Sequence, residues 1–247
     1  MLDWLCSAGD LRRARVDTAI IPLGSIEQHG EALPVGTDHI IACAIAQKVA
    51  ERINAYLLPG IPVGTCQEHT GGTGSVWISA QTYMHMLSDI CFSLTHSGIR
   101  KIALILGHGG LWAVKPAVRQ INLTHRQLSV LHVTPLDMFG SHLSRLIQSE
   151  QADDVHAGEQ EASLCMHLVP DAVRLDRAED SVPKTGREFL DYVPMLELCA
   201  SGVWGFPTRA SREKGEQIFN LVCELTQDYL LRTFSQVEQV KKRIGNS

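Results

Sequence analysis

The segment 99–106 (IRKIALIL) constrains the fold more than any other part of this chain. Its last five residues are all apolar, and the segment runs directly into Gly107-His108-Gly109-Gly110. A short apolar run that ends in glycines is typical of a strand buried on both faces of a parallel sheet. Residues 18–23 (TAIIPL) have the same character and also run into a polar loop. Parallel strands need crossover connections, usually helices, so these segments predict an α/β fold.

Helical periodicity alternates with the strand-like segments along the chain. We expect strands at 18–23, 56–62, 99–106 and 128–134, and helices at 1–17, 40–53, 79–97, 112–125, from 158 onward and at 211–240. This alternation predicts a mostly parallel central sheet with helices on both faces. Residues 170–200 look irregular, as a flap or an oligomer contact would. The sequence has no repeat, linker or break in composition, so we expect a single domain over residues 1–247.

Charge and composition argue against several classes of function. The formal net charge is −5, and no basic block precedes Lys241-Lys242-Arg243, so nucleic-acid binding has no electrostatic support. No apolar run reaches about 18 residues, and the N-terminus lacks the order of a signal peptide. We therefore expect a cytoplasmic protein that does not enter a membrane. The 7 cysteines show no C-x-x-C spacing, which favours buried thiols over disulfides or a cysteine zinc site.

The loop 24–38 (GSIEQHGEALPVGTD) carries a group of potential metal ligands. Glu27 and His29 lie two residues apart, and Asp38 follows a turn that contains glycine and proline. In open α/β sheets, ligands bind beyond the carboxyl ends of the strands. The strand at 18–23 would therefore deliver two acids and an imidazole to such a place, which predicts a metal site.

Further candidates follow other elements: His108 ends the strand at 99–106, and His156 and Glu161 precede or begin a helix. Nitrogen and oxygen ligands without thiolate suit Zn²⁺, Mn²⁺ or Fe²⁺. An aspartate that bridges two ions is the arrangement of many binuclear hydrolases. However, 11 histidines and 27 acidic residues also produce such neighbours by chance. Spacing alone leaves both interpretations open.

Two features near these candidates have alternative interpretations. Glu159 and Glu161 are two positions apart on a helix and point in nearly opposite directions, so we expect one in the site and the other in solvent. The glycine-rich loop 63–75 could bind a phosphate through its backbone, but it has neither a Walker motif nor G-x-G-x-x-G. Its glycines otherwise let the backbone approach a ligand or a neighbouring loop closely.

Four motifs together resemble the creatininase (creatinine amidohydrolase) family. They are Gly24-Ser25-Ile26-Glu27-Gln28-His29-Gly30 with Leu33-Pro34 and Thr37-Asp38; Gly107-His108-Gly109-Gly110; His156-Ala157-Gly158 with Glu161; and Gly202-Val203-Trp204-Gly205-Phe206-Pro207-Thr208 with Lys214-Gly215. They span nearly the whole chain in the family's order. The resemblance implies a single-domain α/β fold, a homo-oligomer that is often a hexamer, and two divalent metal ions in each subunit.

The resemblance also implies a role for each site residue. Glu27 and His108 would bind one metal, His29 would bind the other, and Asp38 would bridge the two. His156 matches the catalytic acid/base that gives a proton to the leaving nitrogen, a task suited to an imidazole.

The sequence departs from creatininase itself at three positions of the site. A metal-binding glutamate is replaced by Gly110, and we expect Glu161 to supply the missing acid, although it could instead cap its helix. A tyrosine is replaced by Gly109 and a gating tryptophan by Ala152, so we expect a substrate other than creatinine. The expected function is hydrolysis of an amide or cyclic amide of a small molecule by a metal-activated water. A non-catalytic or single-metal binding protein of the same fold, and a hydrolase of an oxidised sugar or cyclitol ring, remain the alternatives.

Overall fold

The computed structural model describes residues 1–245, and these contain a parallel sheet of five strands. The strand order is β1-β3-β2-β4-β5. The strands are β1 (Leu2–Asp3), β2 (Thr18–Leu23), β3 (Tyr56–Leu57), β4 (Lys101–Leu106) and β5 (Ser129–Val133). The two longest strands, β2 and β4, pair along their full length from Thr18↔Lys101 to Leu23↔Leu106. The predicted α/β class is therefore confirmed, and these two apolar strands lie at the centre of the sheet.

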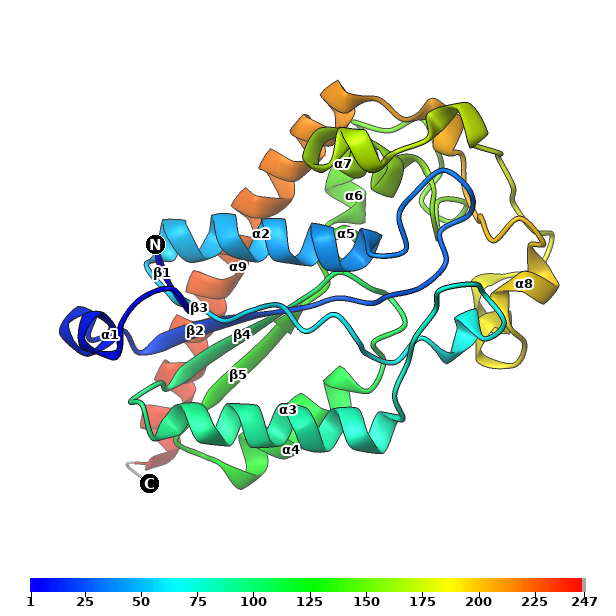
Figure 1. Ribbon diagram of the computed structural model, residues 1–247. Coiled ribbons are helices and arrows are strands. Elements are labelled where there is room, and N and C mark those ends of the chain that lie inside the picture. The colour runs from blue at the N-terminus through cyan, green and yellow to red at the C-terminus, as the bar shows by residue number, and fades with distance from the viewer. Residues whose placement is uncertain (246–247) are drawn as a thin grey trace.

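Helices cover both faces of the sheet (Figure 1). The helices α3 (Ala80–Thr95) and α4 (Val114–Thr124) pack on one face, against a core that includes Ile21 and Leu104. The helices α2 (Thr37–Ile53) and α9 (Arg212–Gly245) pack on the other, against Ile20 and Ile105. Because successive strand residues point to opposite faces, a strand covered on both sides must be apolar throughout. The remaining helices are α1 (Ala8–Ala14), α5 (Pro135–Met138), α6 (Gly140–Leu143), α7 (Glu159–Leu168) and α8 (Met195–Leu198).

Three of the differences from the expected element boundaries have a local cause or affect the site. The N-terminus begins with the short strand β1, and helix α1 starts only after Ser7, whose side chain caps it. Strand β3 ends at Leu57 because Pro59 and Pro62 lack the N–H group that a ladder needs. Helix α2 begins at Thr37 rather than at Ile40, which places Asp38 in its first turn.

Close backbone contact joins the loops after β2 and β4. Both strands are parallel, so both loops leave the same edge of the sheet, next to the start of α2 (Figure 1). A Cβ atom at Gly107 would overlap the backbone carbonyl of Asp38. The glycine therefore allows the loop that carries His108 to lie directly against the first turn of α2.

Two expectations from composition can be compared with the structure. None of the helices in residues 1–245 is both long enough and apolar enough to cross a membrane. All of the cysteines are free thiols, and five of them are buried. The expected absence of a disulfide framework agrees with this arrangement.

Candidate metal centre

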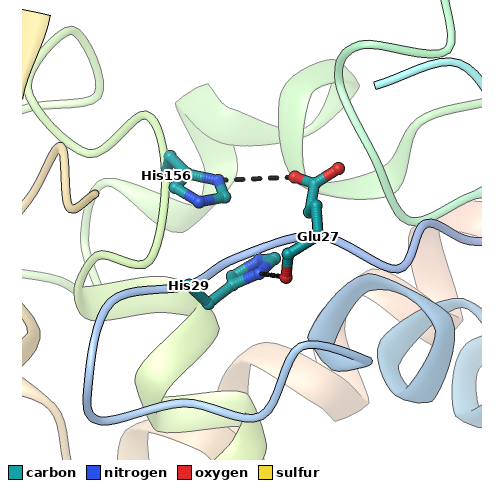
Figure 2. A group of neighbouring side chains, drawn as sticks. All are labelled: Glu27, His29 and His156. Carbon is teal, nitrogen blue, oxygen red and sulfur yellow. Dashed lines mark hydrogen bonds and ion pairs between the residues drawn. The ribbon is translucent and has the colours of Figure 1, made fainter. Parts of the chain in front are cut away.

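Glu27 lies at the middle of the site, four residues beyond the end of strand β2. Its side chain is completely buried, and Oε2 accepts a hydrogen bond from Ser25 Oγ at 2.6 Å. Its other oxygen, Oε1, faces three imidazoles. The distances are 3.1 Å to His108 Nδ1, 3.2 Å to His69 Nε2 and 3.6 Å to His156 Nδ1. Figure 2 shows the approach of His156 to this carboxylate.

Asp38 connects two histidines that come from different loops. Its Oδ1 lies 3.4 Å from His29 Nε2, and its Oδ2 lies 3.4 Å from His108 Nδ1. His29 Nδ1 is 3.1 Å from the backbone oxygen of Glu27, which can only accept, so Nδ1 carries the proton (Figure 2). The lone pair of His29 is therefore on Nε2, directed at Asp38. Glu161 Oε2 lies 3.7 Å from the same nitrogen.

The predicted site residues come together in three overlapping groups. Within each group, one potential ligand atom from every member lies within 4.8 Å of the others. The groups are Glu27 with Asp38 and His108; His29 with Asp38 and Glu161; and Glu27 with His29 and His156. The first two groups share Asp38, so one carboxylate faces two potential ion positions. The third group makes His156 a potential ligand as well as a potential acid/base.

Several polar atoms at the centre of the site have no hydrogen-bond partner in residues 1–245, although they are completely buried. They are Glu27 Oε1, His29 Nε2, Asp38 Oδ2 and His108 Nε2. Buried polar atoms without partners are costly, and they are rare in folded proteins unless a ligand or ion satisfies them. Imidazole nitrogens and carboxylate oxygens are the donors that Zn²⁺ and Mn²⁺ accept. The residues present therefore fit a divalent metal centre.

The pKa values of the acids reflect the crowding of buried like charges. Burial, together with Glu27, raises the pKa of Asp38. Burial, with Asp38 adding to it, raises the pKa of Glu161 to about 8. Ionised carboxylates at such distances repel each other unless a cation lies between them. The acids thus favour occupation of the site by positive charge.

The histidines separate into two kinds. For His29, burial opposes the charged form, but Asp38 and Glu161 outweigh it and raise the pKa to about 10. For His108, the carboxylates of Glu27 and Glu68 likewise outweigh burial and raise the pKa well above its usual value. Burial instead lowers the pKa of His69 to about 3 and that of His156 well below its usual value, helped by neighbouring imidazoles. His69 and His156 are therefore neutral.

Glu159 and Glu161 do not behave as a buried and a solvated pair. Glu161 enters the site and also accepts a hydrogen bond from Ala157 N at 2.6 Å, so it caps the helix start as well. Glu159 is 0% exposed, and the expectation that it is solvated was wrong. Its carboxylate accepts hydrogen bonds from Ser149 and from Lys214 on α9. Helix α7 packs so closely on α9 that its outward face is also buried.

The structure adds Glu68 and His69 to the site, on the short 3-10 helix Gln67–His69. From sequence, this stretch is only part of a polar, glycine-rich loop. His69 Nδ1 lies 3.1 Å from the side-chain nitrogen of Gln28, and its Nε2 faces Glu27. Glu68 Oε1 lies 3.2 Å from His108 Nε2. The sequence signal that could have identified these two residues is an acid followed directly by a histidine in the loop after a strand.

The glycines of the same loop bring it against the first loop of the site. Gly72 leaves no room for a Cβ atom beside the side chain of Gln28, and Ser75 Oγ accepts a hydrogen bond from Gln28 N at 3.0 Å. Val76 N donates to the backbone oxygen of Ile26 at 2.9 Å. Close approach to a neighbouring loop, one of the two interpretations from sequence, therefore accounts for Gly72.

Two adjoining cavities open onto the site. The inner one is about 90 Å³ and is lined by His108, His156 and Glu161, among others. The outer one is about 840 Å³ and is lined by Trp112 and by residues of the segment 187–191. Glu68, Gly109, Gly110, Arg187 and Leu190 line both. The irregular segment 170–200 thus supplies part of the wall around the candidate centre.

Comparison with known proteins gives relatives over most of the chain. The family model described as creatininase, creatinine amidohydrolase, matches residues 6–230. A creatinine amidohydrolase of Pseudomonas putida is 28% identical over 232 residues, which cover 87% of this chain and 89% of the relative. A mycofactocin precursor peptide peptidase of Mycobacterium ulcerans is 30% identical over 226 residues, which cover 86% and 83%. A solved structure described as creatininase Mn has a TM-score of 0.82 at 26% identity, with 94% of this chain and 98% of that one covered. With its fold, its buried group of histidines and acids, and this match over most of its length, the chain belongs to the creatininase family.

Proposed function

We propose that this chain is a metal-dependent hydrolase of a carbon–nitrogen bond, in an amide or cyclic amide of a small molecule, and that it holds two divalent ions. The observation that carries the proposal is the position of Asp38, whose two oxygens each lie 3.4 Å from a different histidine. Glu27 and His108 complete one ion position, and His29 and Glu161 complete the other. Zinc, manganese and iron all suit these donors. Such ions, when bound, polarise a carbonyl and lower the pKa of a water.

His156 is positioned to move a proton. Its Nε2 lies 2.7 Å from the backbone oxygen of Gln28, so Nε2 carries a proton and donates it in a hydrogen bond. Nδ1 then has the lone pair and faces the inner cavity at Glu27. Because His156 is neutral, Nδ1 can accept a proton from the attacking water and return it to the leaving nitrogen.

The residues around the centre favour a substrate other than creatinine. Gly109 and Gly110 add no side chain to the cavity wall, and Trp112, which follows them closely, lines the outer cavity only. The two relatives reported above are named for an amidohydrolase and a peptidase. A common requirement of both reactions is attack of water on the carbonyl of an amide-type bond. This shared requirement supports hydrolysis of an amide-type bond as the reaction class. The residues that line the cavity then determine which substrate fits.

We also propose a homo-oligomer, a hexamer by analogy with the family, in the cytoplasm, with the single domain expected from sequence. Large aromatic side chains on the surface support an interface between subunits, with Trp4, Trp112 and Tyr192 exposed by 52%, 61% and 78%. Light scattering of the purified protein tests the oligomeric state.

The decisive experiment measures metal and activity on the same sample. Protein loaded with zinc or manganese should contain close to two ions per chain and hydrolyse at least one member of an amide and lactam panel. A content below one ion with no hydrolysis would favour the single-metal or non-catalytic alternative, which the absence of a carboxylate at Gly110 motivates. Hydrolysis of lactones or cyclic ketones but no amide would favour a sugar or cyclitol ring as the substrate.

A further inference from the structure

Arg187 lies at the entrance to the candidate centre. It begins the short 3-10 helix Arg187–Asp191, in the segment that forms part of the cavity wall. Its guanidinium passes over Gly109 so closely that a Cβ atom there would lie 2.6 Å from Nη2. Gly109 directly follows the candidate ligand His108. If one bound molecule contacts both Arg187 and the candidate centre, the two parts of it that make these contacts are therefore only a few bonds apart.

The charge of Arg187 is unusual in these surroundings. Among the described residues it is the sole lysine or arginine that lines either cavity. The walls also carry several acids, namely Glu68, Asp137, Asp154 and Glu161 in the inner cavity and Glu68, Glu188 and Asp191 in the outer one. Away from the candidate metal ligands, these acids would repel an anionic group, and Arg187 would attract it.

The existing partner of Arg187 leaves most of its donors available. Nη1 lies 3.4 Å from Asp137 Oδ1, and both side chains are about half exposed. Such an exposed ion pair contributes little free energy, because solvent screens it. A guanidinium has five N–H donors in a planar fork that matches the two oxygens of a carboxylate. Asp137 can thus orient Arg187 while Nη2 remains next to Gly109.

We propose that Arg187 binds a carboxylate of the substrate, so that the chain acts on amides that bear a carboxylate close to the scissile bond, as N-acyl amino acids and C-terminal peptide bonds do. The identification of the ligand as a substrate rests on the proposed function; the carboxylate subsite itself rests on Arg187 alone. The inner cavity of about 90 Å³ takes the reacting amide, and the outer cavity of about 840 Å³ takes the rest of the molecule. Because Arg187 supplies one positive charge and acids surround it, the subsite suits a group with a single negative charge, such as a carboxylate.

The test compares the binding of matched probes to the metal-loaded protein. Titration calorimetry is carried out with the N-acetyl derivatives of glycine, leucine and phenylalanine and with the corresponding carboxamides. We expect at least one acid to bind roughly tenfold more tightly than its carboxamide, in keeping with a charge-assisted hydrogen-bond pair. Arg187→Gln should abolish that preference, and Arg187→Lys should retain part of it. Arg177→Gln is the matched control, because Arg177 is exposed in the same segment and does not line either cavity.

The outcomes separate this inference from the proposed function. A preference for acids that disappears in Arg187→Gln but not in Arg177→Gln supports the subsite, even if no amide is hydrolysed. Equal binding of acids and carboxamides, no binding of any acid, or equal effects of the two variants overturns it. Hydrolysis of a carboxylate-bearing amide with no effect of Arg187→Gln on KM would sustain the proposed function and overturn the subsite.

Discussion

The carboxylate of Glu68 occupies the space beside Gly110. A Cβ atom at position 110 would overlap Glu68 Oε1, and this oxygen lies 3.2 Å from Nε2 of His108. From sequence, Gly110 marks an acid that is missing from the site. In the structure, an acid from another loop lies where a side chain at 110 would begin. Glu68 thus occupies the space that the lack of a side chain at position 110 leaves free.

We expect Gly110→Ala to disturb the site through Glu68. Gly110 does not have a positive φ, so alanine meets no backbone strain there, and the effect comes from overlap with the carboxylate of Glu68 and with Nε2 of His108. Overpacking of this kind costs about 1 to 3 kcal/mol in the free energy of unfolding. Loss of Glu68 from His108 should also weaken metal binding by roughly 10- to 100-fold, as other changes next to metal ligands do. Thermal unfolding and metal titration measure the two effects.

A double-mutant cycle provides the control for this prediction. Glu68→Ala removes the overlapping carboxylate but leaves Nε2 of His108 in place, so adding Gly110→Ala to it should cost less stability than Gly110→Ala alone. Strictly additive effects of the two substitutions would show that the contact between positions 68 and 110 is not the cause.

Asp38→Asn should remove both metal ions. Each oxygen of Asp38 faces a different histidine, and an amide can offer only one neutral oxygen. We expect the metal content, measured by mass spectrometry after dialysis, to fall to nearly none. Asp137→Asn is the matched control, since Asp137 lies at the cavity rim and outside the three ligand groups. Retention of one ion by Asp38→Asn would refute the bridging role.

Much of the fold and half of the site follow from local sequence patterns. Strands β2 and β4 are predictable because their apolar runs are buried on both faces, and Glu27, His29 and Asp38 are predictable because they follow β2 within a single loop. The two-residue strand β1 is too short to produce periodicity, and it forms through pairing with β3.

His108, His156 and Glu161 also follow from motifs in the sequence, whereas two further site residues depend on tertiary contacts that no local pattern contains. Glu68 and His69 come after a loop of irregular backbone, and only its fold over the first loop brings them to Glu27 and His108. The burial of Glu159 depends on Lys214, which is 55 residues away in the chain. Helix geometry predicts that the side chains of Glu159 and Glu161 point in different directions. Whether Glu159 then meets solvent or protein depends on the packing of α7 on α9.

Glu161 and Glu159 allow a test with matched variants on one helix. Glu161→Gln should lose the ion position formed with His29 and Asp38, while the fold stays intact because glutamine can still accept the hydrogen bond of Ala157 N. Glu159→Gln should keep both ions but lower the free energy of unfolding by about 3 kcal/mol, because it removes the charge opposite Lys214. Metal content and chemical denaturation of both variants give the comparison. Equal metal loss in both would contradict the assignment of Glu161.

His156→Ala should separate proton transfer from metal binding. If Nδ1 of His156 moves the proton, the variant keeps both ions and loses roughly 100- to 10,000-fold in kcat. His142→Ala, at an exposed position on α6, controls for the loss of a histidine and should leave kcat unchanged. The group of Glu27, His29 and His156 makes the opposite result informative. Loss of one ion in His156→Ala would identify His156 as a ligand, and the proton would then have to pass through another neutral imidazole, for which His69, 3.2 Å from Glu27, is the one in position.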